Sequence, residues 1–117
     1  MEKIEPKTVE RPWGGFEEFC ENTECTVKIL TVNEGEALSL QKHRRRAEFW
    51  KILSGSAKVL IGGEEAEAKE GDEFNIPPET EHRITAATKT RVLEISLGEF
   101  DEGDEVRLED KYGRAEK

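Results

Sequence analysis

The chain has 117 residues and a formal net charge of −9, which suits one folded domain and argues against a general nucleic-acid or membrane-surface binder. Apolar residues make up 34% and charged residues 38%. Because the apolar residues fall in short alternating runs, we expect a small barrel or sandwich with a charged exterior rather than disorder. Residues 1–8 lack the apolar stretch of a signal peptide, and no stretch approaches the roughly 20 apolar residues of a membrane span, so we expect a cytoplasmic protein.

Cys20 and Cys25 flank residues 21–24, which have the composition of a short hairpin loop. Such a loop places the two sulfurs opposite each other on neighbouring strands. We expect two free thiols, as is usual in the cytosol, with a disulfide as the alternative. A metal site at these cysteines is not expected, because the chain has no further Cys and no spare His to complete it.

Short segments rich in β-branched and aromatic residues recur along the chain, separated by turn residues. Gly62-Gly63 is a two-residue hairpin signal, and Pro77-Pro78 ends a strand because proline cannot donate to the ladder of a central strand. The predicted strands are 27–33, 48–53, 57–61, 64–69, 73–76 and 91–97. Their length and spacing predict an antiparallel barrel or jelly roll, formed as one all-β domain by the whole chain, 1–117.

The last of these strands alternates in character. Leu93, Ile95 and Leu97 lie on one face, and Glu94 and Ser96 lie on the other. We expect the three apolar side chains to face the barrel interior.

The chain has only two histidines, His43 and His82, and they lie in two blocks of similarly placed glycine and polar residues. Gln41 precedes His43 by two residues, so in a strand both side chains point to the same side. Glu48 shares a strand face with the apolar Trp50, and a carboxylate among core residues needs a partner, which a cation supplies. Together Gln41, His43, Glu48 and His82 predict one divalent metal site, with ligands that suit Zn²⁺, Mn²⁺, Fe²⁺, Co²⁺ or Ni²⁺.

Residues 42–46, Lys-His-Arg-Arg-Arg, form a concentrated basic block in this acidic chain. A run of this kind is often only a solvated surface loop. Because the block overlaps the predicted metal site, we expect it to bind an anionic ligand, a phosphate group, for which the arginine guanidinium is well suited.

The four predicted ligands and the glycines around them resemble the two motifs of the cupin superfamily, whose members are small double-stranded β-helix barrels. In the usual pattern a His stands at the position of Gln41, a Gly at Glu79 and an Asn at Ala86. The resemblance implies a single-domain cupin, a jelly-roll barrel that pairs through sheet edges as a homodimer.

A narrower resemblance is to the C-terminal domain of type II mannose-6-phosphate isomerases, which are often fused to a mannose-1-phosphate guanylyltransferase. It extends over about residues 11–114. The family commonly has further histidines where this chain has Arg44, Arg45 and Phe49, and often a basic residue at Ala37. The matching residues are Arg11-Pro12-Trp13-Gly14, residues 38–43, Arg46, Glu48, Trp50, Ser54-Gly55, Ala57, Val59, Ile76-Pro77, His82-Arg83, residues 106–110 and Tyr112-Gly113-Arg114.

The resemblance implies a metal-dependent enzyme that interconverts mannose 6-phosphate and fructose 6-phosphate. The metal would polarise the C1 and C2 oxygens while a base moves a proton, and the base could be Glu48, Glu81, Lys51 or a hydroxide on the metal. We expect Arg44, Arg46 and Arg114 to bind the substrate phosphate and Arg46 to act in catalysis. The chain has no guanylyltransferase domain, so nucleotide transfer is not expected.

Two alternatives stay open. One is a non-catalytic cupin that binds metal and a sugar or sugar phosphate, which the altered histidines favour. The other is a metal-dependent oxygenase, because the same ligand arrangement also serves Fe²⁺ enzymes; the basic block offers that reading no support.

Overall fold

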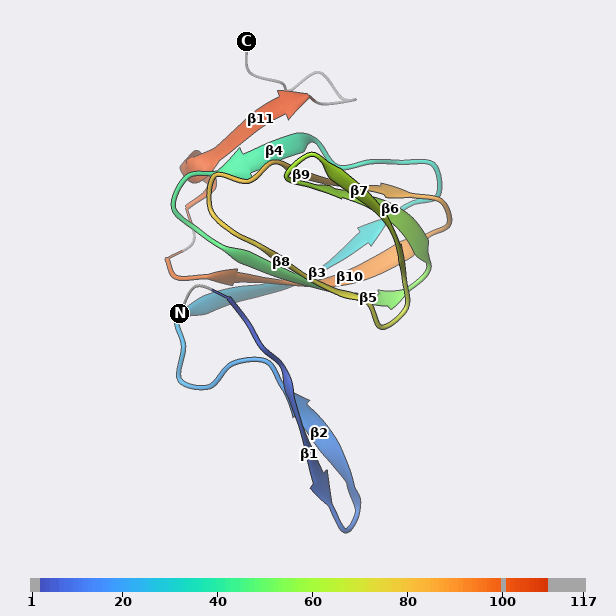
Figure 1. Ribbon diagram of the computed structural model, residues 1–117, viewed down its shortest axis with the longest axis vertical. Coiled ribbons are helices and arrows are strands. Elements are labelled where there is room, and N and C mark those ends of the chain that lie inside the picture. The colour runs from blue at the N-terminus through green and yellow to red at the C-terminus, as the bar shows by residue number, and fades with distance from the viewer. Residues whose placement is uncertain (1–2, 100, 110–117) are drawn as a thin grey trace.

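The computed structural model of the chain describes residues 3–99 and 101–109, and strands dominate it (Figure 1). The one helical element among these residues is a short 3-10 turn, η1 (Glu102–Asp104). The strands are β1 (Lys7–Arg11), β2 (Gly14–Glu18), β3 (Cys25–Val32), β4 (Leu40–His43), β5 (Glu48–Ser54), β6 (Ser56–Ile61), β7 (Glu64–Lys69), β8 (Glu73–Ile76), β9 (His82–Ala86), β10 (Thr90–Leu97) and β11 (Glu105–Glu109). The predicted all-β fold is confirmed.

The barrel consists of two facing antiparallel sheets (Figure 1). The four-stranded sheet has the order β3-β10-β5-β8, and the five-stranded sheet has the order β11-β4-β9-β6-β7. Strands β1 and β2 form a separate hairpin that projects from the barrel along the long axis of the molecule. No helix in the described part of the chain is long and apolar enough to cross a membrane.

The turn signals in the sequence fix several strand ends. Gly62 and Gly63 have φ values of 58° and 84°, the left-handed conformation that a tight two-residue hairpin needs, and they join β6 to β7 with Ile61 opposite Glu64. Strand β8 ends at Ile76, directly before Pro77-Pro78. The predicted bounds of β7 and β8 are therefore confirmed, and β6 begins one residue earlier than the predicted 57–61.

Apolar side chains fill the space between the two sheets. They include Trp50 and Ile52 of β5, Val59 of β6 and Ile84 of β9, all essentially inaccessible to solvent. They alternate along their strands with residues that face outward, as a half-buried antiparallel sheet requires. Burying them gives the barrel its main core.

A second apolar cluster lies on the outer face of the four-stranded sheet. There Phe49 packs with Ile95 and Leu97, and the N-terminal segment covers them with Ile4. Two hydrogen bonds hold this segment: the Ile4 backbone N–H donates to Asn75 Oδ1 at 3.0 Å, and Asn75 Nδ2 donates to the Ile4 carbonyl at 2.9 Å.

This second cluster corrects one prediction. Leu93, Ile95 and Leu97 do not face the barrel interior, because they share the outer face with Phe49. The interior side of β10 instead carries Glu94 and Ser96, which lie opposite Trp50 and Glu48 in the strand register. The prediction was wrong because residues distant in sequence cover the outer face and make both sides of β10 apolar or buried.

The cysteine sulfurs are neighbours, with Cys20 Sγ and Cys25 Sγ 3.8 Å apart and both thiols free. Cys25 begins β3, but Cys20 follows the end of β2 and belongs to no strand. The predicted proximity is therefore present without the predicted strand pairing.

Candidate metal centre

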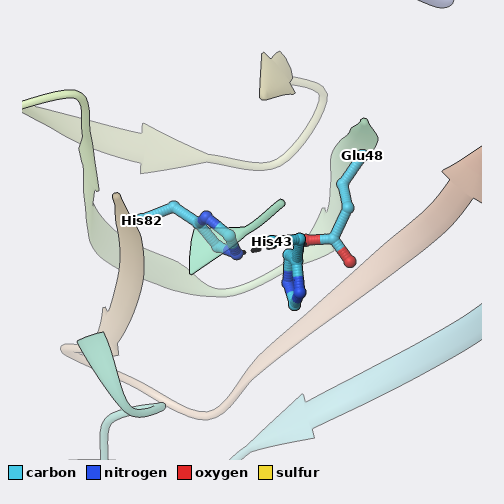
Figure 2. Close-up of side chains that lie close together, drawn as sticks. All are labelled: His43, Glu48 and His82. Carbon is cyan, nitrogen blue, oxygen red and sulfur yellow. Dashed lines mark ion pairs between the residues drawn. The ribbon is translucent and has the colours of Figure 1, made fainter. Parts of the chain in front are cut away.

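Three strand ends bring the side chains of His43, Glu48 and His82 together (Figure 2). His43 ends β4, Glu48 begins β5 after a four-residue loop, and His82 begins β9. Strands β4 and β9 are neighbours, paired through Gln41 and His82. All three side chains are buried, with at most 3% of each residue exposed.

One ligand atom from each of the three side chains lies within 4.8 Å of the others. Glu48 Oε1 is 3.1 Å from His82 Nε2 and 3.4 Å from His43 Nε2. The other ring nitrogen of His82, Nδ1, lies 2.9 Å from the Thr80 carbonyl oxygen. Because a carbonyl only accepts, Nδ1 donates this hydrogen bond, which directs the other ring nitrogen, Nε2, toward Glu48.

The Glu48 carboxyl is ionised at neutral pH. Burial alone would raise its pKa, but the nearby imidazoles of His43 and His82 outweigh burial and hold the pKa well below its usual range. Its second oxygen, Oε2, accepts a hydrogen bond from Ser96 Oγ at 3.1 Å and lies 3.5 Å from Arg46 Nη2.

The donor set fits a divalent metal. Glu48 Oε1 is buried and has no hydrogen-bond partner among the residues described, although both imidazoles face it. A buried carboxylate oxygen that accepts no hydrogen bond is costly, and a cation held between it and the two imidazole nitrogens would offset that cost. Two imidazoles and a carboxylate are a common first-row metal ligand set, so the residues present suit such an ion.

Gln41, the fourth predicted ligand, lines the same pocket. Its amide nitrogen, Nε2, donates a hydrogen bond to Ser39 Oγ at 3.0 Å. That bond directs the nitrogen to Ser39 and leaves the amide oxygen as the atom suited to a metal. The role of Gln41 stays a prediction.

The three arginines predicted to bind phosphate are not assembled in one place. Arg46 is only 7% exposed, and its guanidinium lies at the metal centre, with Nη2 3.3 Å from His43 Nε2. Arg44 is exposed and does not line the pocket. Arg114 lies outside the described residues.

The structure adds pocket residues that sequence reasoning missed. Lys28, Glu94, Glu105 and Arg107 all line the pocket. Burial and the negative charge of Glu48 raise the pKa of Glu94 to about 7, and the nearby Lys28 and Arg46 partly oppose this. Strand alternation could have found Glu94 once the interior face of β10 was known.

The candidate bases do not all reach the pocket. Lys51 lies on the outer side of β5, where its Nζ contacts Glu17 Oε2 at 2.5 Å and Glu73 Oε2 at 3.4 Å. Glu81 is exposed. Of the side chains predicted as bases, only Glu48 lines the pocket.

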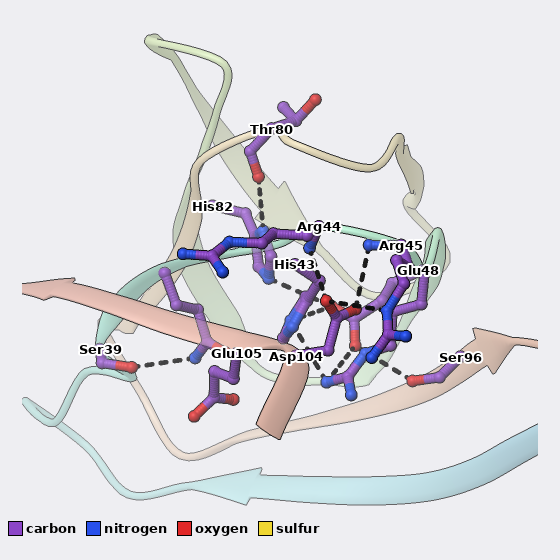
Figure 3. A network of polar contacts seen from close by, with 12 residues as sticks. Ser39, His43, Arg44, Arg45, Glu48, Thr80, His82, Ser96, Asp104 and Glu105 are labelled. Carbon is purple, nitrogen blue, oxygen red and sulfur yellow. Dashed lines mark hydrogen bonds and ion pairs between the residues drawn. The ribbon is translucent and has the colours of Figure 1, made fainter. Parts of the chain in front are cut away.

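Figure 3 shows the polar network around His43, Glu48 and His82. Asp104 of η1 holds the loop between His43 and Glu48. Its carboxylate accepts hydrogen bonds from the backbone N–H groups of Arg44 at 3.1 Å and Arg45 at 3.0 Å. Arg46 Nη1 also donates to the Asp101 carbonyl at 3.4 Å. The turn η1 therefore supports the loop that joins the candidate ligands His43 and Glu48.

Residues 2–110 match the family model described as mannose-6-phosphate isomerase C-terminal. The chain is 37% identical over 111 residues to the mannose-1-phosphate guanylyltransferase ManC of Salmonella typhimurium, covering 92% of this chain and 23% of that protein. It is 38% identical over 111 residues to the xanthan biosynthesis protein XanB of Xanthomonas campestris, covering 92% and 24%. The chain thus spans about a quarter of the length of these relatives.

Solved structures resemble the barrel. A cupin protein from Bacteroides fragilis matches with a TM-score of 0.60 and 28% identity, over 68% of this chain and 71% of that chain. A putative sugar phosphate isomerase from Acidithiobacillus ferrooxidans matches with a TM-score of 0.59 and 16% identity, over 64% and 51%. The predicted cupin fold is confirmed.

The relatives overturn the predicted activity. The mannose 6-phosphate to fructose 6-phosphate isomerase expected from the sequence is wrong, because the relatives are named as mannose-1-phosphate guanylyltransferases and polysaccharide biosynthesis proteins. The sequence-based prediction followed the isomerase resemblance and did not expect the guanylyltransferase activity for which the relatives are named.

Proposed function

Since the chain belongs to the mannose-6-phosphate isomerase C-terminal family of cupin domains, we propose that it is a metal-binding domain that recognises a mannose phosphate in the synthesis of nucleotide-activated mannose. Relatives named as mannose-1-phosphate guanylyltransferases support the substrate class. The observation that carries the proposal is the convergence of His43, Glu48 and His82 on one buried point in a pocket.

His43 Nε2, Glu48 Oε1 and His82 Nε2 would hold the metal, with the Gln41 amide oxygen as a fourth ligand. A metal held there supplies a Lewis acid for the hydroxyl oxygens of a sugar. The cavity of about 160 Å³ at this point has room for several water-sized groups, where one water needs roughly 10–15 Å³, and so suits a monosaccharide better than a single solvent molecule.

Basic side chains supply the contacts that a phosphate needs. Lys28, Arg46 and Arg107 line the cavity. Arg107 is held in place by Glu105, with Nη2 and Oε2 2.6 Å apart. A positioned guanidinium binds phosphate oxygens through charge-assisted hydrogen bonds, so we assign phosphate recognition to Arg46 and Arg107.

The test measures metal and ligand together. We expect about one equivalent of a first-row divalent metal per chain by elemental analysis. We expect titration calorimetry to show binding of mannose 1-phosphate or mannose 6-phosphate that is lost after treatment with a chelator and restored by adding the metal back. Metal loading without binding of either phosphate would refute sugar-phosphate recognition, and absence of metal after incubation with each ion would refute the site.

A further inference from the structure

Cys20 and Cys25 are the only cysteines in the chain, and the fold places their sulfur atoms 3.8 Å apart. A disulfide bond is about 2.05 Å long, so the two sulfurs need to approach by less than about 2 Å. Rotation of each side chain about its Cα–Cβ bond supplies a movement of this size. Both residues are only partly buried, so a small reagent can reach the pair.

The segment between the two cysteines is ordered by its own contacts. Asn22 has a φ of 51°, in the left-handed region that asparagine tolerates better than most residues. Thr23 Oγ1 donates a hydrogen bond to the Glu21 carbonyl at 2.9 Å. The Glu24 carbonyl accepts a hydrogen bond from the Gly98 N–H, also at 2.9 Å, which ties the loop to the end of β10. The loop therefore brings the second cysteine back beside the first along a defined path.

Each cysteine is also held against the barrel. Cys25 begins β3 opposite Leu97 of β10 and packs on the outer apolar cluster. Cys20 directly follows Phe19, whose ring packs on the Phe49 ring of the same cluster, with the centroids 5.6 Å apart. Because the folded barrel and the loop both position the pair, the fold itself holds the two sulfurs within reach of each other.

The pair lies where the N-terminal hairpin meets the barrel. Strands β1 and β2 pair only with each other among the described strands, so the hairpin depends on the contacts at its base. On one side these are the hydrogen bonds of Ile4 with Asn75. On the other side they are the packing of Phe19 and an ion pair from the hairpin to β5. Segments held by few contacts open locally while the rest of a protein stays folded.

We propose that Cys20 and Cys25 are a site of reversible oxidation, at which a disulfide bond fastens the base of the N-terminal hairpin to β3. The oxidant is a small-molecule disulfide such as oxidised glutathione. One cysteine thiolate attacks it and displaces a glutathione thiolate, and the other cysteine then attacks the mixed disulfide, forms the bond and displaces the second glutathione. The cysteines lose two protons and two electrons, which leave with two molecules of reduced glutathione. The site is independent of the metal pocket and its ligand.

The character of the Cys20 thiol agrees with a structural cross-link. A catalytic or rapidly sensing cysteine has a lowered pKa. Burial, the neighbouring Cys25 and the Glu18 carboxylate instead raise the pKa of the Cys20 thiol. Exchange at this pair should therefore be slow, and the property to measure is the equilibrium between thiols and disulfide.

Glutathione redox buffers test the proposal. The reduced full chain is brought to equilibrium at increasing ratios of oxidised to reduced glutathione, the remaining thiols are alkylated, and intact mass counts them. We expect the wild type to lose both thiols together, with a mass lower by two hydrogens and no linked dimer on a non-reducing gel. Cys20→Ser and Cys25→Ser each keep one thiol, so these matched controls should take up glutathione and form no internal bond.

The contribution of the fold is measured in the same buffers with urea. The folded chain should form the bond at least about tenfold more readily than the unfolded chain, because the fold holds the sulfurs together. The four states close a thermodynamic cycle, so oxidation should raise the equilibrium constant for folding by the same factor. A folded wild type that forms the bond no more readily than the unfolded chain, or that binds two separate glutathiones, would overturn the proposal.

Chymotrypsin, which cleaves after aromatic residues, shows whether the bond fastens the hairpin. Phe19 lies at the base of the hairpin, whereas Trp13 lies in the turn between β1 and β2 and is 74% exposed. Oxidation should slow cleavage after Phe19 at least about tenfold, because the local opening that exposes it is restricted. Cleavage after Trp13 should be unchanged and is the internal control. Equal rates of cleavage after Phe19 in the reduced and oxidised forms would contradict the proposed fastening.

Discussion

The carboxylate of Asp104 accepts a hydrogen bond from the backbone N–H of Arg45 at 3.0 Å, across 59 residues of sequence. Asp104 is buried and also binds the N–H of Arg44. These bonds fix the loop that joins two of the three candidate metal ligands. The geometry of the candidate metal centre therefore depends on a turn near the C-terminal end of the described chain.

Replacing Asp104 by Ala should destabilise the protein by about 2–4 kcal/mol, because two part-buried backbone hydrogen bonds lose their charged acceptor. Metal affinity should fall as well, since His43 and Glu48 flank the loop. Asp104→Asn keeps one acceptor oxygen and should restore part of the loss. Denaturant unfolding and metal titration of the three proteins measure this, and equal stability of wild type and Asp104→Ala would contradict it.

The same bonds predict acid sensitivity. Burial alone would raise the pKa of Asp104, but the backbone N–H groups of Arg45 and Arg44 and the charge of Arg45 lower it. Since the folded-state pKa lies below the unfolded-state value, the stabilisation is fully present above about pH 4 and is lost as the pH falls through the folded-state pKa. Unfolding at a series of pH values should show a smaller acid-induced loss in Asp104→Asn than in the wild type.

His82→Ala should weaken metal binding by at least about 100-fold, more than the 10–100-fold that loss of an outer hydrogen-bond partner costs. The matched control is Thr85→Ala on the same strand, where the side chain is exposed. Elemental analysis and a competition titration with a chromophoric chelator give the affinities. A His82→Ala protein that retains metal as well as the Thr85→Ala protein would show that the site is wrong.

Glu94 should make the metal-free protein less stable as the pH rises. Burial raises its pKa to about 7, above the unfolded-state value, so the folded state holds the proton more tightly. Stability should therefore decline between about pH 4 and pH 7 and then level off. Glu94→Gln should remove this decline and gain on the order of 1–3 kcal/mol at pH 8. Urea unfolding in the presence of a chelator, at several pH values, would show no difference in slope if the carboxyl titrates normally.

Arg46→Ala should weaken binding of a mannose phosphate by about 1.5–3 kcal/mol, more than it weakens binding of mannose, because only the phosphate uses the charge-assisted contact. Arg46→Lys should recover part of the affinity, since an ammonium lacks the bidentate fork. Arg44→Ala, a neighbour in the same basic block, should have little effect because its side chain is exposed. Calorimetry that finds equal losses for phosphate and neutral sugar would assign Arg46 to support of His43 and Glu48 instead.

Local signals located much of the fold. The Gly62-Gly63 turn and the Pro77-Pro78 stop act within a few residues, so the strands beside them were placed correctly. The hairpin Lys7–Glu18 and strand β9 carry weaker apolar alternation and were missed. Which side of β10 faces inward depends on Ile4, far away in sequence, and alternation alone cannot decide between two apolar faces.

The residues of the candidate site were likewise predicted only in part from the sequence. His43, Glu48 and His82 were predicted to meet, and they do: short-range spacing places His43 near Glu48, and the second motif block adds His82 from a distant strand. Arg107 and Glu94 were missed because they enter the pocket through pairing between strands distant in sequence. Charge density alone placed Arg44 with Arg46, but the loop turns their side chains to different environments, one exposed and one buried.

The packing of Ile4 has a practical consequence for work with the protein. A protease that cleaves just before Lys7 would remove Ile4 from its contacts with Phe49, Ile95 and Leu97. A short linker that pulls on Lys3 would displace it from the same contacts. Those side chains would then form an exposed apolar surface on the outer face of the four-stranded sheet. The trimmed protein should aggregate even though its pocket is unchanged. Purification tags are therefore safer when a flexible spacer separates them from residue 3.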